Sequence, residues 1–267
     1  MHCAISRFCL LLVLCGTQLL AQQQFDDARR LERKLTSDIL HLKGDQRSII
    51  SEEEQSFPPQ IQELLSAGIL QALNSEASAA QLQSKLESVL ADDSVLAQGT
   101  PGVIEPGNVG VLAFRENRSS ALVIAYGIPY CVMCNRTWLG TYERTAGSYS
   151  NTHSINEVLD NHTIYLHRLP ANGDKQRFVL YGTGLGSYAN PLALRAYEIS
   201  AGSLREFWRL DGLNNGTIEF QDNEILLRYY VVVAGQGALA PRTGRVDKYR
   251  VTAEGIRLES RSEHKED

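Results

Sequence analysis

The sequence predicts a mainly β protein in which an N-terminal helical segment precedes an all-β domain of three four-stranded repeats. Three observations predict this class: an internal repeat, a change from helical to strand periodicity near residue 100, and a glycine- and proline-rich stretch between the two regions. Three such units could form a propeller-blade-like arc, or close as a pseudo-threefold barrel or prism.

The repeat becomes visible when the chain is compared with itself at a shift of 55 residues. Residues 123–149 then align without gaps to residues 178–204, and nine of the 27 positions are identical. A more divergent third copy follows 52 residues later, where Tyr197 aligns with Tyr249. Similarity at a fixed spacing indicates that one supersecondary unit was copied, each copy burying its apolar face against a neighbour.

Residues 1–21 have the composition of a secretory signal peptide. Arg7 is their only charged residue, Phe8 to Leu20 is an almost unbroken apolar run, and Ala21 precedes three glutamines. The run is too short for a spanning helix, which needs about 20 apolar residues. We therefore expect cleavage after Ala21 and a mature protein that is periplasmic or extracellular, with no membrane span.

Residues 22–98 show the spacing of amphipathic helices. We expect a first helix capped by Asp26, a second opened by Pro58-Pro59, and a third from about Ser78. This segment fits either a helical hairpin that packs on the rest or an arm that binds a partner or a second copy. A breaker-rich linker over residues 99–108 then marks the predicted domain boundary.

The β domain is expected over residues 109–262, followed by a disordered tail over 263–267. Its strands are enriched in Tyr, Val, Ile and Thr, with Asn, Asp and Gly at the bends. The expected strands are 109–114, 121–126, 138–144 and from 149 onward, then 163–168, 177–181, 192–199 and 204–210, then 217–220, 224–233, 245–251 and 256–260.

In each copy, the predicted connection between the second and third strands is long. These connections cover residues 127–137, 182–191 and 234–244, whereas common connections have about two to six residues. Equivalent loops should emerge on one face, and long loops on a rigid scaffold often carry binding surfaces. The side chains expected to line such a surface are Tyr130, Trp138, Tyr188, Arg242 and Arg245. The alternative is that the loops are crossovers without a ligand.

The mature chain would retain two cysteines, Cys131 and Cys134. In an oxidising compartment they are expected to form a disulfide with each other. A redox-active pair would need a helix directly after Cys134, but residues 137–142 have the pattern of a strand. A metal half-site completed by downstream histidines is a third alternative, which a disulfide would exclude. We expect no metal site and no cofactor.

Glu143 and Glu198 occupy equivalent positions in two copies, where the third has Arg250. We interpret them as solvent-facing or cross-strand partners, because a pair of general acids needs differently tuned surroundings.

The composition narrows the function classes. A formal net charge of −5 without a Lys/Arg cluster argues against a nucleic-acid partner. No serine-hydrolase or metalloprotease motif is present, so no catalytic residue is predicted. The leading hypothesis is an exported, non-enzymatic binding protein that contacts a protein or glycan. The alternatives are a thiol–disulfide oxidoreductase using Cys131 and Cys134, and a self-assembling structural envelope protein.

Overall fold

The structure is a computed structural model that describes most of the chain. It describes residues 19–37, 54–90, 108–116, 119–131, 134–156, 158–159, 163–184, 191–200, 203–231 and 243–265. Contacts divide the chain into two compact units, Met1–Val158 and Leu159–Asp267. N-terminal helices and two antiparallel sheets confirm the prediction of a mainly β protein. The predicted signal peptide and linker lie largely outside the described residues.

The helical segment contains a helix over 19–37, the short 3-10 helix η1 (Glu54–Ser56), α2 (Phe57–Asn74) and α3 (Ala79–Val89). Proline lies in the first turn of α2, as predicted, where no backbone N–H is needed. A capping box starts α3: the Ser78 hydroxyl accepts from the Gln81 amide, and the Gln81 side chain accepts from the Ser78 amide.

The first helix differs from its prediction. It is already formed at residue 19, so Asp26 lies inside it and does not cap its start. Its buried residues recur every three or four positions: Ala21, Phe25, Ala28, Glu32 and Leu35. The helical pattern therefore begins before the predicted cleavage point, where the sequence alone had suggested only a leader.

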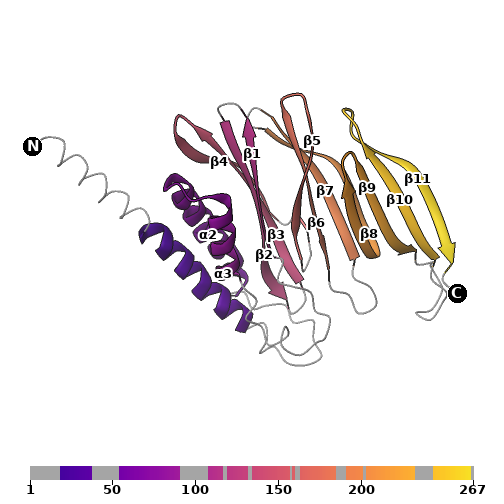
Figure 1. Ribbon diagram of the computed structural model, residues 1–267. Helices are drawn as coiled ribbons and strands as arrows, with labels where there is room; N and C mark the ends of the chain where they lie inside the picture. The colour runs from indigo at the N-terminus through magenta and orange to yellow at the C-terminus, as the bar shows by residue number, and fades with distance from the viewer. Residues whose placement is uncertain are drawn as a thin grey trace, which may run out of the picture. The chain divides into compact units, whose positions relative to one another are not determined.

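The first unit combines these helices with a four-stranded sheet. The strands β1 (Val109–Glu116), β2 (Ser119–Cys131), β3 (Cys134–Thr145) and β4 (Ser148–Ile155) pair in chain order. Figure 1 shows α2 and α3 together beside this sheet, and residues of both helices share one core cluster with β1, β2 and β3. The helical segment is therefore packed on the sheet, as the hairpin alternative expected.

The connection between β2 and β3 is much shorter than predicted. Pairing continues to the hairpin end, where Cys131 is the backbone partner of Cys134. Residues 127–131 belong to β2 and residues 134–137 to β3, so the prediction of a long loop over 127–137 is wrong. Gly127 and Pro129 are uncommon inside strands, but both are paired here, with Thr137 and Asn135.

The second unit is one antiparallel sheet of seven strands. Its order is β11-β10-β9-β8-β7-β6-β5, which is a meander. The strands are β5 (Tyr165–Asn172), β6 (Lys175–Thr183), β7 (Pro191–Ser200), β8 (Ser203–Gln221), β9 (Glu224–Val231), β10 (Thr243–Val251) and β11 (Ile256–Lys265). The last strand extends into the segment predicted as a disordered tail.

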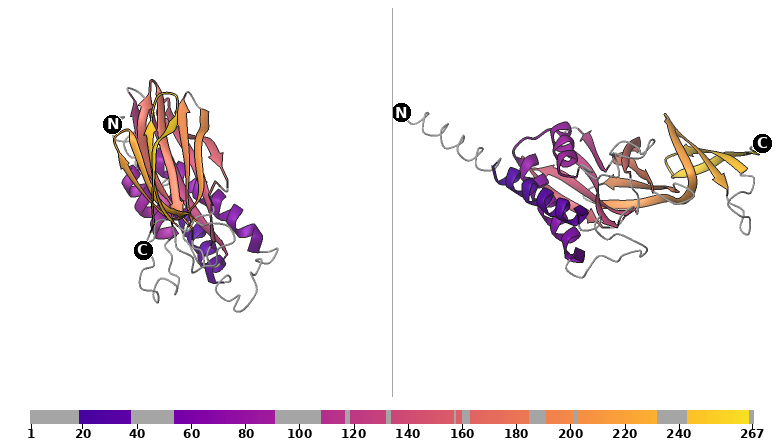
Figure 2. Two further views of the ribbon diagram at one scale, coloured as in Figure 1. Left: turned by 90° about the vertical axis from the view of Figure 1, so that its right-hand side faces the viewer. Right: turned by 90° about the horizontal axis from the view of Figure 1, so that it is seen from below.

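Strand β8 merges two predicted strands and bends the sheet. It pairs with β7 through its first part and with β9 through its second part, with a register shift between Asn214 and Thr217. Gly212 and Asn215 have positive φ there. Figure 2 shows the orange strand changing direction. Residues of β5, β6 and β7 consequently share one core cluster with residues of β9, β10 and β11.

The described strands form two open sheets, with edges at β1 and β4 in one and at β5 and β11 in the other. The equivalent tyrosines Tyr142, Tyr197 and Tyr249 are buried on β3, β7 and β10. However, Tyr142 pairs with Leu122, whereas Tyr197 pairs with Phe178, the residue aligned to Val123. The two hairpins thus differ by one residue in register. The threefold repeat and its closure stay predictions.

Gly216 provides a test of the bend in β8. A Cβ atom at this position would lie 2.8 Å from Cβ of Leu192, closer than carbon atoms can approach. We expect Gly216→Ala to lower the free energy of unfolding by about 1–3 kcal/mol, because the bend must open. Urea denaturation would measure this. Thr217→Ala, at the next and exposed position, is the control; an equal loss in both variants would contradict the steric explanation.

Candidate functional site

Four aromatic side chains of the second unit contact one another, and we call Tyr165, His167, Tyr181 and Phe220 the aromatic strip. Tyr165 and His167 alternate along the edge strand β5, so both point to the same face of the sheet. Tyr181 is the direct partner of Tyr165 on β6. Phe220 comes from the far end of β8, which reaches β5 because the sheet is bent.

The rings of the aromatic strip are stacked or tilted against one another. The centroids of Tyr165 and Tyr181 are 5.3 Å apart, and those of His167 and Phe220 are 3.8 Å apart with nearly parallel planes. Phe220 also lies 5.4 Å from Tyr181. Tyr165 is 39% exposed, one of few large apolar or aromatic side chains so exposed among the described residues.

The aromatic strip is uncharged near neutral pH. Burial lowers the pKa of His167, so its imidazole is neutral. Burial, followed by the neighbouring Tyr165, raises the pKa of Tyr181. The strip therefore offers ring faces and hydroxyl groups without a formal charge, a combination that protein interfaces use often because aromatic rings bury a large area with little entropy loss.

A second group of polar side chains lies across β9, β10 and β11. Asp247 is 1% exposed, and both its oxygens accept from Arg261 at 2.7 Å. The hydroxyl groups of Tyr229 and Tyr249 donate to it at 2.9 and 3.3 Å. Burial opposes ionisation of Asp247, but these donors outweigh it and hold the carboxyl pKa below its usual range. Burial raises the pKa of Tyr249 to about 12, so its hydroxyl stays protonated.

The predicted binding residue Arg245 borders this group. It is the cross-strand partner of both Tyr229 and Glu263. Its guanidinium lies over the Tyr229 ring at 6.0 Å and donates to the Glu263 carboxylate. Arg245 stands near the start of β10, directly after the predicted third loop. Its charge is already paired, so a partner that used it would have to compete with Glu263.

A third charged group surrounds Glu198, which is 3% exposed. Its register neighbours are Arg177 on β6 and Arg205 on β8. Arg205 donates to its carboxylate at 2.6 Å and Lys175 at 3.2 Å. Burial opposes ionisation, but these hydrogen bonds prevail and the pKa of Glu198 is lowered. The interpretation of Glu198 as a cross-strand partner is confirmed.

Arg177 joins distant strands of the same unit. It is 3% exposed, and its guanidinium donates to the backbone oxygens of Thr252 and Ala253 at 2.6 Å each. It also contacts the Glu198 carboxylate at 3.5 Å and lies over the Phe207 ring at 5.0 Å. These hydrogen bonds connect the β10–β11 turn to β6. These contacts give Arg177 a structural role.

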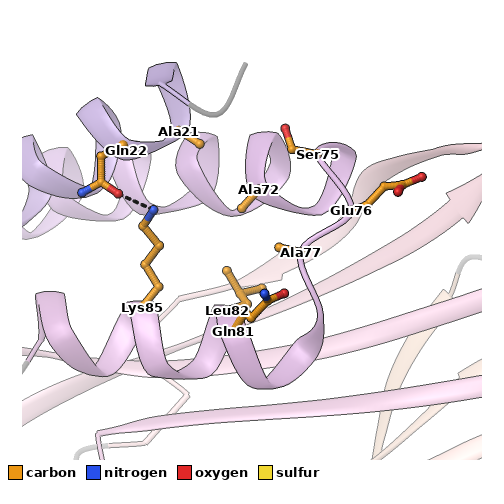
Figure 3. Close-up of a pocket in the computed structure, with 9 residues that line it drawn as sticks. All are labelled: Ala21, Gln22, Ala72, Ser75, Glu76, Ala77, Gln81, Leu82 and Lys85. Carbon is orange, nitrogen blue, oxygen red and sulfur yellow. Dashed lines mark hydrogen bonds between the residues drawn. The ribbon is translucent and has the colours of Figure 1, made fainter. Parts of the chain in front are cut away.

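The first unit contains a pocket of about 490 Å³ in its helical part. Figure 3 shows its wall, which combines the first helix with the end of α2, the α2–α3 turn and α3. The lining residues are Ala21, Gln22, Ala72, Ser75, Glu76, Ala77, Gln81, Leu82 and Lys85. The floor is made mostly of alanine and leucine, while the rim carries one cation and one carboxylate.

The five predicted binding residues do not form one described surface. Trp138 is 6% exposed and belongs to the core under the helices, because β3 continues through it. Tyr188 and Arg242 lie outside the described residues, as does the side chain of Tyr130. The binding role of these residues stays a prediction.

The cysteine pair lies at the tip of a hairpin. Strand β3 begins at Cys134, so a strand follows the pair, as the sequence predicted. No helix N-terminus is therefore available to lower the pKa of the first thiol in the manner of thioredoxin-like proteins. The disulfide itself stays a prediction.

No group of three or more acidic, histidine or cysteine side chains within the described ranges could hold a metal ion. Among the helices of that same part of the chain, none has the length and apolar character needed to cross a bilayer.

Sequence reasoning missed the aromatic strip. Tyr165 and His167 alternate with Leu166 and Arg168, which is a local signal for a shared face. The contact with Phe220 has no local signal, because it depends on the bend in β8. The pocket was missed for a different reason: two of its residues lie at the predicted cleavage point.

Comparisons with known protein families and curated proteins do not assign this chain to a family. No protein-family model matches the chain, and no curated protein matches it.

Arg177 gives a prediction about stability. We expect Arg177→Met to lower the free energy of unfolding by about 3–5 kcal/mol, because two backbone oxygens lose their donor and the buried Glu198 carboxylate loses one of its three cationic partners. Urea denaturation would measure the change. Arg209→Met is the control, since Arg209 is an exposed partner of Glu206 and should cost less than about 1 kcal/mol. A small effect at Arg177 would contradict the role assigned to it.

Asp247 gives a prediction about pH. Its lowered pKa means that its contribution to stability is present above the ordinary carboxyl pKa of about 4 and is lost as the pH falls through the folded value. Asp247→Asn should therefore destabilise the protein more at pH 7 than at pH 3, measured by urea denaturation. Asp174→Asn, in an exposed turn, should show no such difference. An equal loss for Asp247→Asn at both pH values would refute this assignment.

Proposed function

We propose that this chain is an exported, non-enzymatic binding protein that contacts a protein or glycan through its second unit. The observation that carries the proposal is the aromatic strip: four uncharged aromatic rings in contact with one another, two of them on the edge strand β5, with Tyr165 39% exposed. Exposed aromatic side chains on rigid strands bury much area on binding, and such residues supply a large part of the energy of many interfaces.

The position of the strip adds support. Tyr181 is close to the end of β6, and the predicted second loop, with Tyr188, follows directly. We propose that this loop extends the surface begun by the strip. Arg242 and Arg245 of the same unit were also predicted as binding residues. Tyr130 and Trp138 were predicted as well but belong to the first unit, and Trp138 lies in its core.

Several finer features belong to the same proposal. Residues 1–21 act as a signal peptide, which directs the protein to the periplasm or the cell exterior, and Cys131 and Cys134 form a disulfide at the tip of the β2–β3 hairpin. Cys131 and Cys134 are backbone register partners in this hairpin. The three four-stranded segments descend from one repeated unit.

The described charged groups support a binding role over a catalytic one. Asp247 and Glu198 have lowered pKa values and several donors each, so they stay ionised and occupied. A general acid or base instead needs a pKa near the working pH and an accessible proton. The oxidoreductase alternative has no helix after Cys134, and the self-assembly alternative has no specific observation in its favour.

The test combines two assays with one set of variants. Purified protein is applied to an array of defined glycans, and a photoreactive residue at position 165 captures protein partners in the cells that produce the chain. We expect Tyr165→Ala to weaken the binding found by about tenfold, because a stacked ring is lost. Tyr165→Phe should retain it, since the ring remains.

The matched control is Leu258→Ala. Leu258 is 45% exposed on β11 of the same unit but lies outside the aromatic strip. Its removal should leave binding unchanged. If Tyr165→Ala bound as well as the wild type while Leu258→Ala did not, the aromatic strip would not be the contact surface.

A further inference from the structure

Gln22 occupies an unusual position in both sequence and structure. The predicted cleavage point lies between Ala21 and Gln22, and the first described helix runs through this bond. Ala21 is 3% exposed and Phe25 is 1% exposed. Phe25 packs closely on α2, where a Cβ added to Gly68 would lie 3.2 Å from its ring. Phe25 therefore fixes the helix, and cleavage would leave Gln22 held at the rim of the pocket.

The carboxamide of Gln22 has two defined contacts. Its Nε2 donates to Oδ1 of Asp26 at 2.8 Å, one turn further along the helix. Its Oε1 accepts from Nζ of Lys85 on α3 at 2.5 Å, as Figure 3 shows. The Lys85 ammonium also lies 5.0 Å from the centre of the Phe25 ring. Gln22 itself is exposed, so its carboxamide is accessible while its carbonyl oxygen faces a cation.

We propose that Gln22 becomes the N-terminal residue and is converted to pyroglutamate, with Lys85 stabilising the reacting carbonyl. This inference rests on the export and cleavage proposed above. The neutral α-amino nitrogen attacks Cδ of its own side chain, which forms the N–Cδ bond of a five-membered lactam. The Cδ–Nε2 bond breaks, a proton passes from the α-nitrogen to Nε2, and ammonia leaves. The reaction needs no oxidant, reductant or cofactor.

Lys85 lies where charge develops in this reaction. In the tetrahedral intermediate the negative charge builds up on Oε1, the atom that Lys85 already contacts. A cation placed at the developing oxyanion lowers the barrier, because it stabilises the intermediate more than the neutral amide. Lys85 would follow the carboxamide through its flexible stem when the side chain folds back toward the α-nitrogen.

The electrostatics of the helix end favour the product. A free α-ammonium group at residue 22 would place a positive charge at the positive end of the helix dipole. It would also belong to the residue whose side chain contacts Lys85, a like charge. The lactam carries no charge, so conversion removes both unfavourable interactions and leaves Lys85 as the cation of the pocket rim.

The first experiment identifies the natural N-terminus. The full chain, with its own leader, is produced in a host that exports proteins, and the purified product is analysed by intact mass and by N-terminal sequencing. The expected product begins at residue 22, lacks one ammonia and is blocked to sequencing. A product with a free Gln22 amine, or one that begins elsewhere, would overturn the proposal.

The second experiment tests the chemistry of the site. Protein beginning at Gln22 is released from a fusion partner by a protease that leaves no extra residue, and loss of ammonia is followed by mass. Gln22→Asn should stay unblocked, because its lactam would have a strained four-membered ring. Lys85→Met should slow the reaction by about tenfold or more.

Lys34→Met is the matched control, because Lys34 also lies over a phenylalanine of the helical part but is twelve residues further along the same helix, roughly 18 Å from Gln22. It should react at the wild-type rate. Equal rates for Lys85→Met and the wild type would overturn the role of Lys85. Both experiments read mass, so their failure is distinct from a failure of Tyr165→Ala to weaken binding.

Discussion

The second unit depends on the buried guanidinium of Arg177, which connects strands on either side of the bend in β8. A buried cation is costly unless every donor direction finds an acceptor or an opposite charge. Two backbone oxygens of the β10–β11 turn and the Glu198 carboxylate meet most of this demand. Glu198 in turn needs Arg205 and Lys175. The charges are thus stable only together, which couples the bending of the sheet at β8 to the pairing of its first strands.

The aromatic strip depends on the same bend in β8. In the sheet order, β6 and β7 lie between β5 and β8, so Phe220 could not reach His167 in a flat sheet. The bend at Gly216 brings the end of β8 back over β5, and the two rings stack at 3.8 Å. The core residues Leu192 and Leu194 of β7 lie beneath the bend. The proposed binding surface therefore has no local origin: it exists only when the whole unit has folded.

The sequence predicted the strands well because alternating apolar residues and turn residues are local signals. It could not predict that β8 continues through Gly212 and Asn215, since both residues are typical of turns and only pairing with β7 and β9 keeps the strand intact. Trp138 shows the same difficulty: it was expected at the first position of a strand, beside an exposed loop, but pairing continues past it and places it in the core beside Tyr126. Long-range contacts decided each of these cases, and for the same reason the strip was not foreseen.

In the described part of the second unit, the buried charged groups and the proposed contact residues are different side chains. Its buried carboxylates are surrounded by donors that keep them ionised, so they have little capacity left for a ligand. The aromatic strip has the opposite character, because burial keeps His167 neutral and Tyr181 protonated. A partner that covered the strip would displace water from the exposed side of Tyr165. It would not have to break a strong ion pair within the strip. The main entropy cost of binding would then come from ordering the partner. The rings stand on paired strands that are already ordered, so they add little to this cost.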